Sequence, residues 1–249
     1  WESEGTDAAK WFNLLGISAF VLKYRVPAPH VWNTSAQLCD GQRAVSLVRR
    51  MAPALGLSAS RIGLFGASYG GMVATFTAFA EERQYASRDA VDVESFRPDF
   101  LVLLYPLILP IMWGGPVIKG SITKQESVRG VTMNLTRQIP IFAAVGARDG
   151  CCSPDLLYEF FSVLSNRSTP VMETNIYADI GHGFTMCYRA ERGGWEAMQH
   201  EACTWMSRAR RFIMWHVEGK TPADVQKWYR RMMTFDTSLL STNSTVPAR

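Results

Sequence analysis

Short apolar runs alternate with segments of helical periodicity along most of the chain. The runs 100–104 and 141–145 are continuous and bounded by proline or glycine, which is typical of strands buried on both faces. Segments 37–55 and 72–80 read as helices, the first with apolar residues repeating at helical spacing. This alternation predicts an α/β fold, a mostly parallel sheet with helices on both faces.

The same pattern predicts the remaining elements. We expect helices at 7–15, 156–164, 192–215 and after a capping box at Thr221 and Asp224, and strands at 19–24, 61–65 and 171–177. The long connection 106–138, rich in glycine and proline, is expected to form a lid or pocket wall. Together with Trp113 and the corner Tyr105-Pro106, it is expected to shape a pocket. We divide the chain into an α/β domain, 1–216, and a C-terminal helix with a disordered tail, 217–249.

Composition narrows the class of protein. With 249 residues, 47% hydrophobic and 19% charged, the chain can bury one sizeable core and is not a disordered protein. Its net charge of +4 is not gathered into a basic stripe, so we expect no nucleic-acid partner. The longest apolar run, 100–113, is broken by Pro106 and Pro110 and is too short to span a membrane.

Cysteine and asparagine patterns bear on metals and on the cellular compartment. The chain has five cysteines, namely Cys39, Cys151, Cys152, Cys187 and Cys203. They have no metal-type spacing, so we predict no metal site, and we interpret most of them as small buried apolar residues. An N-glycosylation acceptor pattern begins at Asn33, Asn134, Asn166 and Asn243, which favours a secretory route.

A G-x-S-x-G pattern, Gly66-Ala-Ser68-Tyr-Gly70, lies where the apolar strand 61–65 ends and a helical segment begins. In that context the pattern predicts a nucleophile elbow, with Ser68 on a sharp strand-to-helix turn. Gly66 and Gly70 are expected to remove side-chain collisions across this turn. The Tyr69 backbone N–H, at the start of the helix, is expected to donate to a developing oxyanion.

A serine nucleophile needs a base and a carboxylate that orients the base. His182 lies on a glycine-flanked loop after a predicted strand, where it can accept the Ser68 proton. Asp149 follows a buried strand and is the predicted partner of the histidine, with Asp155 and Asp179 as alternatives. The chain order Ser68, Asp149, His182 is the order of the α/β-hydrolase fold.

Several segments resemble the acetylxylan-esterase and dienelactone-hydrolase-like branch of the α/β-hydrolases. They are Asp149-Gly-Cys-Cys-Ser-Pro154, Gly181-His-Gly-Phe184 and residues 4–27, 40–45 and 57–63, and the resemblance spans about residues 2–206. It implies a serine carboxylesterase without a cofactor, acting on small-molecule or carbohydrate esters, often acetyl esters. Prolyl-oligopeptidase-type serine peptidases share the catalytic order, so peptide hydrolysis is the alternative.

The chain departs from that branch at its beginning. Members carry a Gly-rich oxyanion loop after an early strand, in a segment that would precede Trp1. We therefore expect an N-terminally truncated α/β-hydrolase, with its first strands and second oxyanion donor missing. Losing one such donor lowers the rate by about 100- to 1000-fold. A catalytically impaired scaffold that acts in binding is the third hypothesis, and the sequence defines no oligomeric state.

Overall fold

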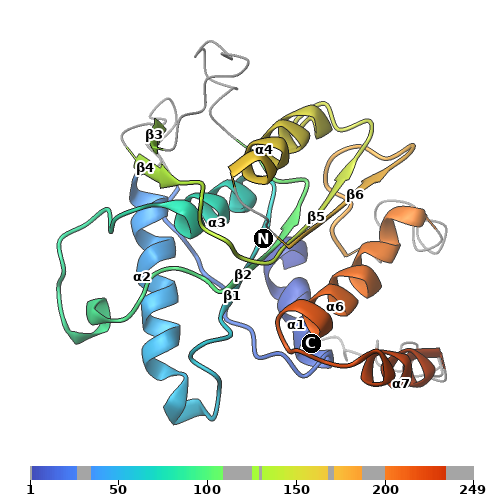
Figure 1. Ribbon diagram of the computed structural model, residues 1–249, viewed down its shortest axis with the longest axis horizontal. Coiled ribbons are helices and arrows are strands. Elements are labelled where there is room, and N and C mark those ends of the chain that lie inside the picture. The colour runs from blue at the N-terminus through green and yellow to red at the C-terminus, as the bar shows by residue number, and fades with distance from the viewer. Residues whose placement is uncertain are drawn as a thin grey trace, which may run out of the picture.

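A parallel sheet forms the centre of the molecule. The computed structural model describes residues 2–26, 35–108, 125–128, 131–167, 171–186 and 200–233 (Figure 1). Four strands are hydrogen-bonded in the order β1-β2-β5-β6, namely β1 (Gly63–Ala67), β2 (Phe100–Leu104), β5 (Ile141–Gly146) and β6 (Met172–Tyr177). All their pairings are parallel, which confirms the predicted α/β class and these strands.

Helices cover both faces of this sheet, as predicted (Figure 1). One face carries α1 (Ala8–Leu14) and α6 (Trp205–His216), and the other carries α2 (Ser35–Met51), α3 (Tyr69–Phe79) and α4 (Pro154–Arg167). The structure also contains a π-helical stretch, Glu2–Asp7, and three short 3₁₀ helices, Pro53–Leu55, Ala90–Val93 and Glu201–Thr204. Among the described residues, no helix combines the length and the apolar character needed to cross a bilayer.

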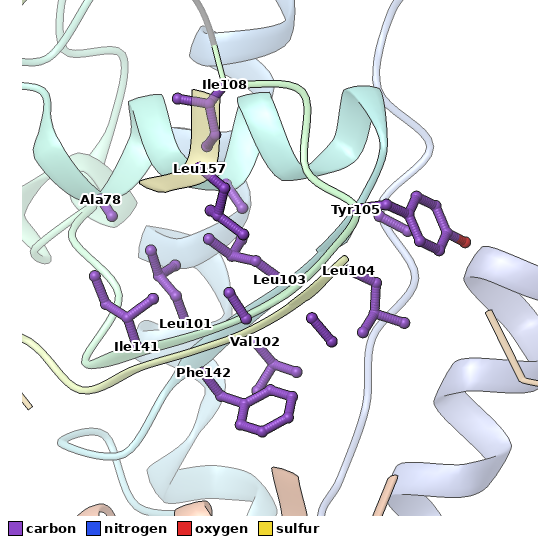
Figure 2. Close-up of a cluster of buried hydrophobic side chains, with 14 of the residues drawn as sticks. Ala78, Leu101, Val102, Leu103, Leu104, Tyr105, Ile108, Ile141, Phe142 and Leu157 are labelled. Carbon is purple, nitrogen blue, oxygen red and sulfur yellow. The ribbon is translucent and has the colours of Figure 1, made fainter. Parts of the chain in front are cut away.

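The two central strands are buried on both sides. Every residue of β2 and β5 is buried. In Figure 2, Leu101 and Leu103 point toward Ala78 of α3 and Leu157 of α4, whereas Val102 points to the opposite face. Both faces of the sheet therefore need apolar side chains, which explains the uninterrupted apolar runs in the sequence.

Aromatic rings fill the layer beneath α1 and α6. The Trp205 ring lies 5.0 Å from the Trp11 ring and 6.2 Å from the Phe65 ring of β1. Farther along the sheet, Phe142 of β5 lies 6.0 Å from Phe212 of α6. Large rings bury much apolar area per residue, so this layer fixes α1 and α6 against the sheet.

The predicted strand 19–24 is wrong, because these residues form no strand in the structure. A strand needs a hydrogen-bonded neighbour, and in the described sheet β1 pairs only with β2. Arg25, directly after the segment, is instead tied to α2. Its guanidinium lies 2.8 Å from the Asp40 carboxylate, and its backbone N–H donates to the same carboxylate at 2.9 Å.

The connection 106–138 contains an element that the sequence analysis missed. Strands β3 (Gln125–Val128) and β4 (Val131–Asn134) form an antiparallel pair, and Met133 bridges to Ala80 at the end of α3. The predicted lid remains a prediction, because residues 109–124 and 129–130, with Trp113, lie outside the described residues. The same holds for 192–199 of the predicted helix 192–215 and for the tail 238–249.

A separate helix, α7 (Pro222–Met233), follows α6. The Thr221 N–H donates to the Asp224 carboxylate at 2.9 Å, and the Asp224 N–H donates to the Thr221 hydroxyl at 3.3 Å. These reciprocal bonds satisfy N–H groups that would otherwise lack partners at the helix start. The predicted capping box is confirmed.

The turn from β1 into α3 holds Ser68 in an unusual backbone conformation. Ser68 has φ of +51° and ψ of −121°, a region that non-glycine residues seldom occupy. Its N–H donates to the Leu104 carbonyl at 3.0 Å, and its carbonyl accepts from the N–H groups of Gly71 and Leu107 at 3.0 and 2.8 Å. These bonds hold both ends of the strained residue.

The glycines around this turn differ in what they accommodate. A Cβ atom at Gly66 would lie 2.4 Å from the Gly70 carbonyl oxygen, so glycine avoids a collision there, as predicted. The prediction for Gly70 is wrong, because nothing lies within 4 Å of a Cβ atom there. Gly71, which the sequence analysis passed over, would bring a Cβ atom within 2.5 Å of Pro106 Cβ.

We therefore expect Gly66→Ala and Gly70→Ala to differ in stability. Gly66→Ala forces backbone against backbone and should lower the free energy of unfolding by about 2 kcal/mol or more. Gly70→Ala adds a methyl group in open space on a helix and should change it by less than about 1 kcal/mol. Guanidinium denaturation followed by circular dichroism measures both values. Equal losses for the two variants would contradict the steric account.

Candidate active site

Ser68, Asp149 and His182 meet at one edge of the sheet. Each follows the carboxyl end of a parallel strand, respectively β1, β5 and β6, and such ends gather at one edge of an α/β sheet. His182 Nε2 lies 2.9 Å from Ser68 Oγ, and His182 Nδ1 lies 2.8 Å from Asp149 Oδ2. The three predicted site residues thus form one hydrogen-bonded chain.

The Asp149 carboxylate is fixed by backbone donors. Its side chain is fully buried, and Oδ1 accepts from the N–H groups of Cys151 and Cys152 at 2.9 and 2.7 Å. Oδ2 is thereby directed at His182. Because an ionised carboxylate can only accept hydrogen bonds, the Nδ1 atom of His182 carries the proton. Nε2 is then the acceptor that faces the Ser68 hydroxyl.

The two alternative carboxylates lie elsewhere. Asp179, which has φ of +58°, forms an ion pair with Arg148 on the surface, where the two side chains are 69% and 72% exposed. Asp155 lies in the first turn of α4. Among the described residues, the carboxylate bonded to His182 is that of Asp149.

Backbone contact brings the Asp149 and His182 loops together. The N–H of Arg148 donates to the Ile180 carbonyl at 3.0 Å, and the N–H of Ala147 donates to the Tyr177 carbonyl at 2.8 Å. At Gly146, a Cβ atom would lie 2.3 Å from the Ile180 oxygen. Only glycine allows this approach, so Gly146 sets the distance between the acid and the base.

Tyr105 is a site residue that the sequence analysis assigned only to a pocket wall. It follows β2 with φ of +33°, and its ring packs edge-on against the His182 ring at 4.7 Å. Its hydroxyl donates to the Glu4 carboxylate at 2.9 Å and is bonded to the Thr185 hydroxyl. Burial, together with the charge of Glu4, raises the pKa of Tyr105, so the phenol stays protonated. In the sequence, the position of Tyr105 directly after a predicted buried strand is the feature that could have indicated this role.

Tyr69 is the first residue of α3. Its backbone N–H belongs to the first turn of the helix, where the helix dipole is positive. This is the position that the sequence predicted for an oxyanion donor. Its donation to an oxyanion stays a prediction.

Two cysteines lie beside the candidate triad. Cys152 is 2% exposed, which fits a small buried residue, but that interpretation is wrong for the exposed Cys151 and the half-buried Cys39. Cys203 is disulfide-bonded. Burial raises the pKa of the Cys152 thiol, and the neighbouring Cys151 and Asp149 raise it further. The sequence analysis judged cysteine spacing along the chain and therefore missed that His182 approaches both thiols.

Comparisons with known proteins place this geometry in context. No protein-family model and no curated protein sequence matches the chain. Among solved structures, an acetyl ester-xyloside bifunctional hydrolase from Caldicellulosiruptor lactoaceticus is similar, with a TM-score of 0.66 and 26% identity over 86% of this chain and 77% of that one.

Two further solved structures are similar to this chain. An alpha/beta hydrolase enzyme from a Medee basin deep-sea metagenome library has a TM-score of 0.64 and 21% identity, over 86% of this chain and 77% of its own. A thermophilic esterase from Thermogutta terrifontis, solved with propionate bound, has a TM-score of 0.64 and 20% identity over 84% and 75%. The parallel sheet, its helical layers and these similarities show that the chain has the α/β-hydrolase fold.

Proposed function

We propose that the chain is a serine hydrolase that cleaves carboxylic esters, with Ser68 as nucleophile, His182 as base and Asp149 as the orienting acid. One observation carries the proposal, namely the continuous hydrogen-bonded chain from Ser68 Oγ through both ring nitrogens of His182 to the buried Asp149 carboxylate. A serine hydroxyl is a weak nucleophile unless a base accepts its proton, and this chain of bonds supplies such a base.

Acylation begins when Ser68 Oγ attacks the ester carbonyl carbon and its proton passes to His182 Nε2. The negative charge that develops on the carbonyl oxygen is stabilised by the Tyr69 N–H at the start of α3. His182 then gives its proton to the departing alcohol oxygen as the ester bond breaks. The acyl group remains on Ser68.

Deacylation repeats these steps with water. His182 Nε2 accepts a proton from water, whose oxygen attacks the acyl carbon, and the same proton returns to Ser68 Oγ as the acid leaves. Throughout both steps, Asp149 stabilises the positive charge on the imidazole. Tyr105 packs edge-on against the same ring and limits its rotation.

Short acyl esters, including acetyl esters of carbohydrates, are the proposed substrates. The resemblance of segments such as Gly181-His-Gly-Phe184 to acetylxylan esterases supports this choice. Two similar structures also support it, because one is an acetyl ester-xyloside hydrolase and another is an esterase solved with propionate.

Ser68→Ala tests the nucleophile. The unmodified chain should react with a fluorophosphonate probe at one serine and should hydrolyse p-nitrophenyl acetate. The variant should lose labelling and at least about 1000-fold of the turnover, because no hydroxyl remains to attack. Gel fluorescence and release of p-nitrophenol measure the two effects.

Ser60→Ala is the matched control, since Ser60 is an exposed surface serine and should leave both readouts unchanged. Circular dichroism establishes that each variant is folded. A folded, unmodified chain that reacts with neither reagent would overturn the proposal in favour of a non-catalytic scaffold. Faster turnover of a peptide than of an acetyl ester would favour a peptidase.

Asp149→Asn tests the acid. An asparagine can present its amide N–H to His182 Nδ1, which leaves the proton on Nε2 and removes the base for Ser68, so kcat should fall by about 1000- to 10,000-fold. Asp179→Asn breaks only the exposed pair with Arg148 and should change kcat less than twofold. Steady-state ester hydrolysis compares the two. A greater loss in Asp179→Asn would assign the acid to Asp179.

A further inference from the structure

Two thiols stand next to the candidate triad, and the proposed mechanism uses neither. The sulfur atoms of Cys151 and Cys152 and a ring nitrogen of His182 all lie within 4.8 Å of one another. The Cys152 thiol is also within hydrogen-bonding reach of the Ser68 hydroxyl and of the Cys151 thiol. The Cys151 side chain is exposed, so solvent reaches this cluster.

We propose that Cys151, Cys152 and His182 form a binding site for a thiophilic divalent cation such as Zn²⁺, and that the bound cation blocks hydrolysis by occupying the base. Binding itself does not depend on the proposed function. The inhibitory effect rests on it, because only a chain that uses His182 as a base loses activity when that nitrogen is occupied.

The donor set suits such a cation. Thiolate and imidazole are the ligands that Zn²⁺ prefers in proteins, and three protein ligands leave one position for water. Bonds of about 2.3 Å to sulfur and about 2.0 Å to nitrogen hold tetrahedral ligand atoms roughly 3.5 to 3.8 Å apart. The three atoms in the structure are at most 4.8 Å apart, so small side-chain movements suffice, and the exposed Cys151 has room to make them.

Asp149 is bonded to all three residues of the proposed site. Its Oδ2 holds Nδ1 of His182, which leaves Nε2 as the nitrogen with a lone pair. Its Oδ1 accepts from the backbone N–H groups of Cys151 and Cys152 and so fixes the chain that carries both thiols. A carboxylate that bonds to the second nitrogen of a metal-binding histidine is the usual partner of zinc ligands, because it sets the tautomer and raises the basicity of the ring.

Occupation of the site and activation of Ser68 exclude each other. The Nε2 lone pair that would bind the cation is the one that accepts the Ser68 proton. The cation has to displace the protons of the thiols, as metals do when they bind cysteine. The loss of the base should therefore be complete at saturation and reversible by a chelator.

Co²⁺ binding to the Ser68→Ala chain tests the site without any need for activity. Co²⁺ replaces Zn²⁺ in tetrahedral sites and gives thiolate charge-transfer absorption in the near ultraviolet and visible bands typical of tetrahedral coordination. Metal-free protein handled without oxygen should bind one equivalent with both features, and Zn²⁺ should displace it. Absence of the thiolate absorption would overturn the proposal.

Cys151→Ser is the informative variant, because Cys151 is exposed and its replacement leaves the core intact. It should weaken Co²⁺ binding by at least about tenfold. Cys39→Ser is the matched control: it removes a half-buried free thiol from α2 and should not change the affinity. Equal affinities for Cys151→Ser and the unmodified chain would overturn the proposal.

Inhibition is measured on active protein. The rate of ester hydrolysis of each variant in Zn²⁺ is divided by the rate of the same variant in the presence of a chelator. Zn²⁺ should inhibit the unmodified chain and Cys39→Ser with the same concentration dependence, and Cys151→Ser should need at least about tenfold more. Equal inhibition of all three would place the effect elsewhere and overturn the regulatory role. If the unmodified chain hydrolyses no ester, the proposed function fails, whereas the Co²⁺ result still decides whether the site exists.

Discussion

The register of the parallel strands determines the rest of the structure. Ala67 at the end of β1 pairs with Leu104 of β2, and Leu104 pairs with Ala144 of β5, so the strands end at nearly the same level. The ladder then continues past these ends, because the N–H of Ser68 donates to Leu104 and the N–H of Tyr105 donates to Ala144. A shift of one residue would turn every side chain to the other face of the sheet and would separate Ser68 from His182.

This register also supports two strained residues. Ser68 and Tyr105 both have positive φ, and such conformations cost about 1 to 3 kcal/mol each in non-glycine residues. They persist because the residues before them are paired in the sheet, Ala67 with Leu104 of β2 and Leu104 with Ala144 of β5. In addition, the Ser68 carbonyl accepts from the N–H groups of Gly71 in α3 and of Leu107 after β2. The result is a hydroxyl and an aromatic ring that both contact the imidazole of His182.

Local patterns in the sequence were sufficient to predict most of this arrangement. The apolar runs predicted β2 and β5 because both of their faces are buried, and the order of Ser68, Asp149 and His182 predicted residues that the structure brings together. The failures concern contacts between distant segments. Segment 19–24 needed a pairing neighbour, and the role of Gly71 depends on Pro106, which lies outside the motif. The approach of two thiols to His182 depends on how two loops fold, which spacing along the chain does not encode.

Asp149 connects the two proposed properties of the site. A carboxylate that gives His182 an available Nε2 lone pair creates a base for Ser68 and, by the same hydrogen bond, a ligand for a metal ion. One histidine is not sufficient to hold a metal ion, and a site needs further ligands close to it. In the proposed site these ligands are the thiols of Cys151 and Cys152, whose backbone N–H groups also hold Asp149 in place. The anchoring of the acid and the delivery of two thiols are therefore one structural feature, and a change that loosens one loosens the other.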